Sequence, residues 1–263
     1  MPDFTLLGEG DPEPVRVLRP AGRSDFLLTA DHAGRAIPRR LGDLGLPEHE
    51  LSRHIAWDIG IAGVTEKLAD LLDAAAVLQR YSRLVIDCNR RPEWDSAIPT
   101  VSELTEIPGN IAIAAAEREA RRHEIFAPYH RQIAALIDAR AAAGRRTVLA
   151  AMHSFTPVFR GERRPVEVGI LYHRDVRLAR IMLDLLRAEG DLAVGDNAPY
   201  AITDTSDYTV PAHGEERGLP HVEIEIRQDL IADDAGQAAW ARRLARLLPL
   251  AAQRLRGDAP CFC

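Results

Sequence analysis

Four short apolar runs in this chain carry side chains that can do acid–base or metal chemistry. The runs are FLLTADH at 26–32, LVIDCNR at 84–90, VLAAMHS at 148–154 and HVEIEIR at 221–227. Apolar runs of this length, bounded by polar or turn residues, are typical of buried strands. In an open α/β sheet, ligands bind outside the carboxyl ends of the strands. The runs therefore predict that histidines, carboxylates and an Asn-Arg pair gather at one edge of one sheet.

The two histidines favour a metal site. His32 and His153 each follow an apolar run and precede a loop, and imidazole is a common zinc ligand. A catalytic zinc usually has three protein ligands and one open position, so a third ligand is needed. The segment HIAWDIG offers both Asp58, which opens a predicted helix at 58–72, and His54. Spacing alone does not choose between them, and an Asp near a helix start is also an ordinary cap.

The fourth run carries alternating charges. Glu223, Glu225 and Arg227 alternate with apolar residues, so their side chains share one face of a strand. A half-exposed edge strand has the same pattern, but the flanking apolar helices favour a covered sheet. A covered glutamate beside a metal is placed to act as a general base in hydrolysis.

The second run begins and ends in side chains that favour an anionic substrate. Arg83 precedes the run, and Asn89 and Arg90 close it. The guanidinium fork binds carboxylates in a bidentate manner, so these residues, together with Arg227, are candidates for substrate binding. Asp87 in the same run is an alternative, structural partner for one of the arginines. The sequence contains no phosphate-binding glycine loop, no dinucleotide fingerprint and no nucleophile elbow.

Composition bounds the class of protein. The 263 residues are 46% hydrophobic, enough for one domain over 1–263 with a full core. A net charge of −6 argues against a nucleic-acid partner. No apolar run reaches the length of about 20 residues that spans a membrane, and the N-terminus lacks a signal-peptide pattern. Three cysteines (Cys88, Cys261 and Cys263) without a framework spacing fit a reducing compartment. We therefore expect a cytoplasmic protein without a membrane or nucleic-acid partner.

The order of predicted elements favours an α/β fold. Strands are predicted at 24–30, 76–80, 84–90, 147–154, 166–172 and 221–227, and helices at 58–72, 111–143 (broken near Pro128), 176–189 and 235–255. Asp234 is the predicted N-cap of the last helix. Residues 1–23 are predicted to form a loop or edge segment and 256–263 a tail, with long polar loops at 91–110 and 191–220. Such alternation predicts a single domain with a mainly parallel central sheet flanked by helices.

At these residues the chain resembles the N-formylglutamate amidohydrolase family. The matching stretches occur in the family's order between about 26 and 231: ADHAG, HIAWDIG, SRLVIDCNR, HSFTPVF, the loop around His213, and EIEIRQDLI. The family is related to the zinc carboxypeptidase and succinylglutamate desuccinylase group, and the resemblance implies a phosphorylase/hydrolase-like fold. The group's His-x-x-Glu signature is missing, because Arg35 stands three residues after His32. The carboxylate ligand must therefore come from elsewhere in the chain.

The resemblance also implies a role for each site residue. It implies His32, Asp58 and His153 as ligands of Zn²⁺ or another divalent metal, Glu225 as the base, and Asn89 and Arg90 as carboxylate anchors. His213 becomes a candidate for stabilising an oxyanion or orienting the substrate. The expected reaction is hydrolysis of a small N-acyl amino acid, with N-formyl-L-glutamate to glutamate and formate as the leading case. The alternatives are a carboxypeptidase-like or other deacylating metallohydrolase, and a non-catalytic ligand-binding member of the fold. The sequence leaves the acyl group, the amino acid, the native metal and the oligomeric state open.

Overall fold

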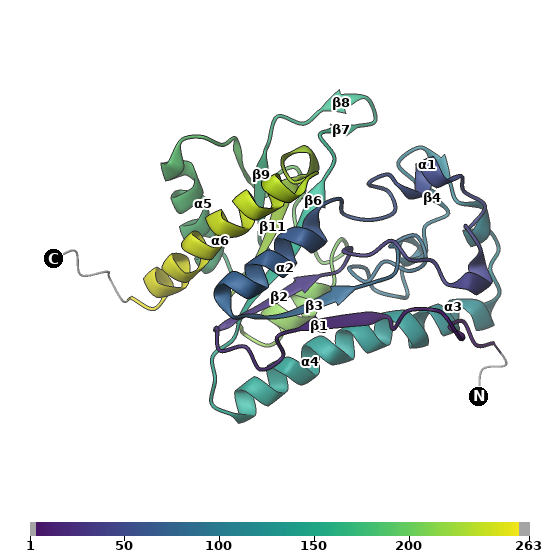
Figure 1. Cartoon of the computed structure of the whole chain (residues 1–263), viewed down its shortest axis with the longest axis horizontal. Helices are drawn as coiled ribbons and strands as arrows, with labels where there is room; N and C mark the ends of the chain where they lie inside the picture. The colour runs from purple at the N-terminus through teal and green to yellow at the C-terminus, as the bar shows by residue number, and fades with distance from the viewer. Residues whose placement is uncertain (1–3, 258–263) are drawn as a thin grey trace.

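One seven-stranded sheet organises the chain in the computed structural model, which describes residues 4–257 (Figure 1). The strand order is β1-β3-β2-β6-β11-β9-β10. The bounds are β1 Val15–Leu18, β2 Phe26–Ala30, β3 Ala75–Gln79, β6 Val148–Phe155, β9 Val168–Leu171, β10 Val194–Asp196 and β11 His221–Arg227. The central strands β3, β2, β6 and β11 run parallel, whereas β1 is antiparallel to β3 and β9 is antiparallel to β11. The predicted α/β class with a mainly parallel sheet is confirmed.

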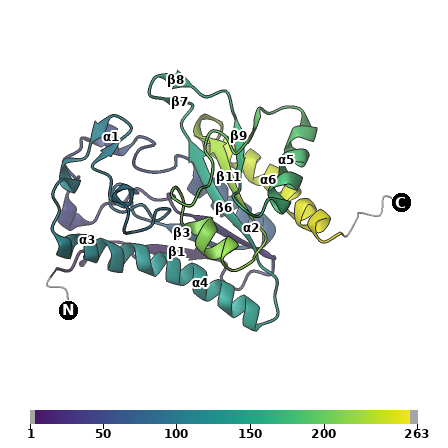
Figure 2. The same ribbon diagram turned by 180° about the vertical axis from the view of Figure 1, so that it is seen from behind.

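Helices cover both faces of this sheet, which explains why its strands are almost uniformly apolar. On one face lie α2 (Ile61–Leu72), α5 (Arg177–Glu189) and α6 (Asp234–Leu255), and on the other lies α4 (Ala127–Ala142) (Figures 1 and 2). Successive side chains of a strand point to opposite faces. Phe26 and Leu28 accordingly join the core beneath α2 and α6, whereas Leu27 joins the core beneath α4.

Short elements outside the sheet build the loops above its carboxyl edge. They are α1 (Glu48–Leu51) and two small hairpins, formed by β4 (Val101–Ser102) with β5 (Thr105–Glu106) and by β7 (Val158–Phe159) with β8 (Glu162–Arg163). The remaining pieces are 3₁₀ turns at Arg39–Leu41, Asp95–Ala97, Pro108–Asn110 and Gln228–Leu230, and π turns at Arg122–Phe126 and Val210–Glu215. Figure 1 shows both hairpins on the same side of the molecule.

The predicted strand at 84–90 is wrong, because this buried segment forms turns rather than a ladder. Side chains satisfy its backbone in place of a neighbouring strand. Arg121 donates to the carbonyl of Val85, Asn110 to that of Leu84, and the His130 ring lies 2.8 Å from the carbonyl oxygen of Cys88. Buried backbone groups need partners but not necessarily a sheet. An apolar run therefore predicts the burial of such a segment without fixing its conformation.

Other elements differ from the prediction at their ends. The helix predicted from 111 begins as α3 (Ala115–Arg121) and passes through the π turn at Arg122–Phe126 into α4. The irregularity thus precedes Pro128, whose missing N–H is harmless in the first turn of α4. The cap of α6 is Asp233, which accepts from the backbone N–H of Gly236, rather than Asp234. The polar stretch at 191–220 contains β10, a short edge strand.

The expected edge segment at 1–23 contains β1, which pairs with β3. Cys261 and Cys263 in the predicted tail lie outside the described residues. Within residues 4–257, no helix combines the length and apolar character that crossing a membrane requires.

Candidate active site

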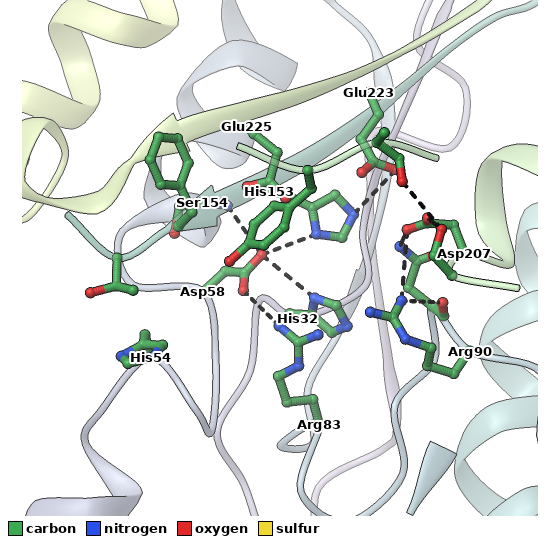
Figure 3. A pocket seen from close by; sticks show the side chains of 16 residues that line it. His32, His54, Asp58, Arg83, Arg90, His153, Ser154, Asp207, Glu223 and Glu225 are labelled. Atoms are coloured by element: carbon green, nitrogen blue, oxygen red, sulfur yellow. Dashed lines mark hydrogen bonds and ion pairs between the residues drawn. The ribbon is translucent and has the colours of Figure 1, made fainter. Parts of the chain in front are cut away.

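The carboxyl ends of the central strands deliver the polar side chains to one cavity of about 250 Å³ (Figure 3). His32 follows β2, His153 lies near the end of β6, and Glu225 stands beside His153 in the parallel register of β11 and β6. Asp58 precedes α2, whose first residue is Ile61, and caps no helix. All four side chains line the cavity, as expected for the ligand-binding edge of an α/β sheet.

His32, Asp58 and His153 form one buried group. Each offers a ligand atom, and these atoms lie within 4.8 Å of one another. Asp58 Oδ2 lies 3.0 Å from His153 Nδ1 and 3.6 Å from His32 Nδ1. The last distance exceeds a hydrogen bond, so His32 Nδ1 is buried without a hydrogen-bond partner. Two nitrogens and one carboxylate oxygen around an unsatisfied buried atom are a donor set that suits a transition-metal cation.

A second carboxylate holds the far nitrogen of each histidine ring. His32 Nε2 lies 2.7 Å from Asp87 Oδ1, and His153 Nε2 lies 3.2 Å from Asp31 Oδ2. Histidines that bind metals almost always place their other ring nitrogen against a carboxylate or carbonyl, which fixes the ring's orientation and tautomer. Both Nδ1 atoms are thereby directed toward the same point as Asp58.

Opposite charges dominate the electrostatics of this group. Burial alone would raise the pKa of Asp58, but His32 and His153 outweigh it and hold that pKa well below its ordinary range. Burial also opposes the histidine charges, yet the surrounding carboxylates raise the pKa of His153 well above its usual value. The carboxylates around the two histidines therefore favour positive charge within this group, either as protons on the rings or as a metal cation.

Two glutamates of β11 face the same cavity. Glu223 and Glu225 are both buried, and the Oε2 atom of each has no hydrogen-bond partner. Burial raises the pKa of Glu225 to about 7, with the charge of His153 opposing the shift and that of Asp58 adding to it. Glu223 Oε2 lies 4.0 Å from His153 Nε2. A carboxylate that exchanges its proton near neutral pH is suited to general base catalysis.

The predicted carboxylate anchors have different surroundings. Arg83 and Arg90 both line the cavity. Arg83 donates from Nε and Nη2 to Asp87, the structural pairing that the sequence offered as an alternative, and reaches Asp58 from Nη1 at 3.4 Å. Arg90 Nη1 donates to the Asn89 carbonyl and lies 3.6 Å from Asp207 Oδ1, whereas its Nε and Nη2 have no hydrogen-bond partner among the described residues. Arg90 therefore has more unused donors than Arg83.

Asn89 lines the cavity, but both groups of its side-chain amide are hydrogen-bonded to other residues of the protein. Its Oδ1 accepts from the backbone N–H groups of Tyr208 and Thr209, and its Nδ2 donates to Asp207. An amide engaged in this way holds the 207–209 segment in place, and direct binding of a substrate carboxylate by Asn89 stays a prediction. The structure therefore assigns Asn89 a supporting position in the wall.

Three other candidates lie away from the ligand group. His54 lines the cavity but pairs with Glu103 at 3.4 Å and does not join the cluster, so Asp58 is the better third ligand. His213 is buried in the π turn at Val210–Glu215, stacked on His130 and outside the cavity wall. Arg227 is also outside it, because Asp229 and Glu167 hold its guanidinium. The structure thus does not bring His213 or Arg227 to the cavity wall, and the roles proposed for them from the sequence stay predictions.

Sequence reasoning missed several residues that build the site. Asp31, one position before His32, holds His153 and accepts from Thr209 Oγ1 at 2.8 Å. Asp207 and Tyr200 line the cavity from the polar loop at 191–220. The Asp-His pair at 31–32 is no guide to this role, since Asp31 holds His153 and it is Asp87 that holds His32. The residues of the loop follow no pattern that would mark them.

The His130–His213 pair gives an expected pH dependence of stability. Burial lowers the pKa of His213 to about 3 and that of His130 to about 4, with Arg217 opposing and Asp31 favouring the charge on His213. The unfolded chain protonates near pH 6.5, so the stability is present above that pH and is lost as pH falls toward 4. Each histidine contributes a slope of about 1.4 kcal/mol per pH unit.

Replacing His213 by Gln should remove one such slope. Urea unfolding of the wild type and His213→Gln between pH 7 and 4 measures it, and the variant's free energy of unfolding should fall less steeply. His49→Gln, at an exposed histidine, serves as the control and should leave the slope unchanged. Parallel curves for wild type and His213→Gln would show that the buried pair is not responsible.

Fold and site together define an α/β protein with a mainly parallel sheet, whose carboxyl edge carries acid–base side chains and candidate metal ligands. The family model for N-formylglutamate amidohydrolase matches residues 24–232. The chain belongs to the N-formylglutamate amidohydrolase family, as its motifs predicted. Hydrolysis of an amide bond is the activity that this membership supports.

Solved structures agree with the family assignment. A gene product from Agrobacterium tumefaciens is 43% identical with a TM-score of 0.91, over 95% of this chain and 99% of that one. An N-formylglutamate amidohydrolase from Ralstonia eutropha is 20% identical with a TM-score of 0.65, over 94% of this chain and 100% of that one, which shows a shared fold. The comparison with curated proteins gives no match.

Proposed function

We propose that the protein is a zinc-dependent amidohydrolase of small N-acyl amino acids, with N-formyl-L-glutamate as the leading substrate. The observation that carries the proposal is the buried group of His32, Asp58 and His153, with its unpartnered His32 Nδ1 facing the same cavity as Glu225. His32 Nδ1, His153 Nδ1 and Asp58 Oδ2 would hold the ion. Zinc held there would supply Lewis acidity, which polarises an amide carbonyl and lowers the pKa of water to about 7.

Glu225 is the proposed general base. Its Oε2 atom faces the cavity without a partner, beside His153 in the sheet register. Glu225 accepts a proton from the attacking water and passes it to the nitrogen that leaves as the amine. A buried, unpartnered glutamate is costly to a protein that only binds a ligand, so its presence favours catalysis over the non-catalytic alternative.

Arg83 and Asp87 balance the buried charges of the site and orient the His32 ring. Arg83 is committed to Asp87 and lies near Asp58, so it balances the buried carboxylates. Burial would raise the pKa of Asp87, but Arg83 and then His32 hold it well below its ordinary range. Asp87 therefore stays ionised and keeps the His32 ring oriented. Arg83 acts on the site through these carboxylates.

Hydrolysis of N-formyl-L-glutamate tests the proposal directly. The purified protein should release formate and glutamate, a chelator should abolish the release, and added Zn²⁺ should restore it. Hydrolysis of one amide bond gives one formate and one glutamate, so the two products should appear in equal amounts in the same sample. Turnover that persists unchanged after exhaustive chelation would refute the metal dependence.

Arg90 is expected to control substrate binding more than chemistry. Its Nε and Nη2 would hold a carboxylate that keeps its charge throughout the reaction, while Nη1 stays with Asn89 and Asp207. Arg90→Leu should raise KM by roughly ten- to a hundredfold, the worth of a charged hydrogen bond, with a smaller effect on kcat. Arg90→Lys should not restore KM, because a point charge does not reproduce the fork.

Steady-state kinetics on N-formyl-L-glutamate and on its carboxyl-amidated analogues measure this effect. The wild type should discriminate against an analogue that lacks the gripped carboxylate, and Arg90→Leu should lose that discrimination. Equal kcat/KM for the acid and the amides in the wild type would mean that no carboxylate is recognised.

A further inference from the structure

The hydroxyl of Thr209 forms a long-range hydrogen bond to a carboxylate that holds a proposed metal ligand. Its Oγ1 donates to Asp31 Oδ1 at 2.8 Å, between residues 178 positions apart in the sequence. The other oxygen, Asp31 Oδ2, lies 3.2 Å from His153 Nε2. Thr209, Asp31 and His153 are all buried, with exposed fractions of 0%, 1% and 2%. The three side chains therefore form one buried chain of hydrogen bonds that ends at the proposed ligand.

Thr209 does not use its hydroxyl for the local turn. It occupies the N-cap position of the π turn at Val210–Glu215. A threonine in such a position commonly accepts a hydrogen bond from a backbone N–H of the turn that follows. Here the side chain makes no cap hydrogen bond, and the hydroxyl donates to Asp31 instead. This choice of partner indicates that the hydroxyl serves the carboxylate rather than the turn.

The backbone of Thr209 is held in place as well. Asn89 Oδ1 accepts from the N–H groups of Tyr208 and Thr209, at 3.0 Å from each nitrogen. The backbone N–H of Asn89 in turn donates at 2.8 Å to Asp87 Oδ1, the same oxygen that lies 2.7 Å from His32 Nε2. Thr209 is thus connected, directly or through Asn89, to the carboxylates that hold both proposed histidine ligands.

A fixed Asp31 carboxylate determines which nitrogen of His153 is available to a metal. An ionised carboxylate only accepts hydrogen bonds, so Asp31 favours the tautomer with the proton on Nε2 and the lone pair on Nδ1. Nδ1 is the atom that lies 3.0 Å from Asp58 Oδ2 in the proposed ligand group. Without the Thr209 hydroxyl, Asp31 would lose a donor that fixes the plane of its carboxylate, and the His153 ring would be less well oriented.

We infer that Thr209 is a positioning residue of the proposed metal centre, because its hydroxyl fixes Asp31 and Asp31 fixes the His153 ring. This inference rests on the proposed function, to which it adds a residue that contacts neither metal nor substrate. The loop that carries Thr209 also brings Asp207 to the cavity, where its Oδ1 lies 3.6 Å from Arg90 Nη1 (Figure 3). The same loop therefore serves both the cavity wall and the ligand histidine.

The experiment measures the zinc affinity of the purified protein by competition with a chromophoric chelator, which requires no substrate. Thr209→Val removes the hydroxyl, keeps the size of the side chain, and should weaken zinc binding roughly tenfold. This is the lower end of what the loss of an outer-shell partner costs, because Thr209 acts through Asp31. Thr209→Ser keeps the hydroxyl and should bind zinc within about twofold of the wild type. Thr209→Ala also lacks the hydroxyl and provides the same test if Thr209→Val does not fold.

Thr65→Val is the matched control. Thr65 is also fully buried, and its Oγ1 donates over the same distance of 2.8 Å, but to the Ile61 carbonyl within α2 and outside the cavity wall. The control variant loses a buried hydroxyl hydrogen bond without altering Asp31, so its zinc affinity should stay within about twofold of the wild type. Thermal unfolding of the metal-free samples shows how much stability each valine variant loses.

The outcomes separate this inference from the proposed function. If the wild type binds zinc and Thr209→Val binds it equally well, the positioning role is overturned and the proposed function stands. Zinc binding by Thr209→Ser or by Thr65→Val that is as weak as that of Thr209→Val also overturns the role, because the loss then does not follow the hydroxyl at Asp31. A wild type that binds no zinc overturns the proposed metal centre, and the inference with it.

Discussion

Glu225→Gln should lower kcat by roughly two to four decades while the protein remains folded and loaded with metal. The substitution keeps the shape of the side chain but removes the proton-accepting oxygen, and a general base is worth about that factor. Glu225 has an unpartnered Oε2, so the amide breaks no hydrogen bond of that atom. The measurement is single-substrate kinetics on N-formyl-L-glutamate, with metal content and circular dichroism determined for the same samples.

Glu223→Gln is the matched control for this variant. Glu223 lies two residues earlier on the same face of β11, is also buried, and also has an unpartnered Oε2. Its kcat should fall less than that of Glu225→Gln. If the ranking is reversed in metal-loaded variants, Glu223 is the base. Near wild-type turnover of Glu225→Gln would exclude Glu225 from proton transfer.

His153→Asn should abolish turnover, with a loss of roughly three decades or more, because the variant removes one of the proposed ligands. Asn offers no imidazole nitrogen at the Nδ1 position. It also leaves Asp31 without its ring partner, so some loss of stability is expected. Steady-state turnover measured with excess Zn²⁺ gives the size of the effect.

A stability control keeps that result interpretable. His130→Asn also alters a buried histidine of the same region, but one that lies outside the cavity wall. If both variants unfold at a similar temperature and only His153→Asn loses turnover, the loss comes from the site. Comparable turnover in both variants would remove His153 from the proposed ligand set.

The sequence predicted the sheet well because its central strands are covered on both faces. The runs at 26–30, 148–155 and 221–227 are almost entirely buried, and three parallel strands at the centre of the sheet bring His32, His153 and Glu225 to one cavity. The parallel register of β11 with β6 sets Glu225 beside His153. Strand ends thus carried most of the information about the candidate site.

The segment at 84–90 shows where apolar patterning is insufficient. It is as apolar and as buried as a strand, but the side chains of Asn110, Arg121 and His130 take its carbonyl groups. These partners come from distant parts of the chain, and no local pattern reveals them. For the same reason no local pattern reveals that the Asn89 amide, predicted to bind substrate, hydrogen-bonds the Asp207 carboxylate and the backbone N–H groups of Tyr208 and Thr209.

Charge alternation in β11 was informative for only part of the strand. Glu223 and Glu225 face the cavity, but Arg227 at the end of the strand reaches Asp229 and Glu167 instead. His213 was placed near the reacting centre by family resemblance, yet it packs against His130 within the protein. A long side chain at a strand end has several partners within reach, so a shared face does not fix its contact.

The zinc content of the purified protein tests the proposed metal centre most directly. Elemental analysis after dialysis against metal-free buffer should find about one equivalent of zinc in the wild type and in His54→Ala, and a small fraction of that in Asp58→Asn. His54 provides the sharp comparison, because it lines the same cavity without joining the ligand group. A wild type that is fully active without a bound metal, or zinc retained by Asp58→Asn and lost by His54→Ala, would contradict the proposed centre.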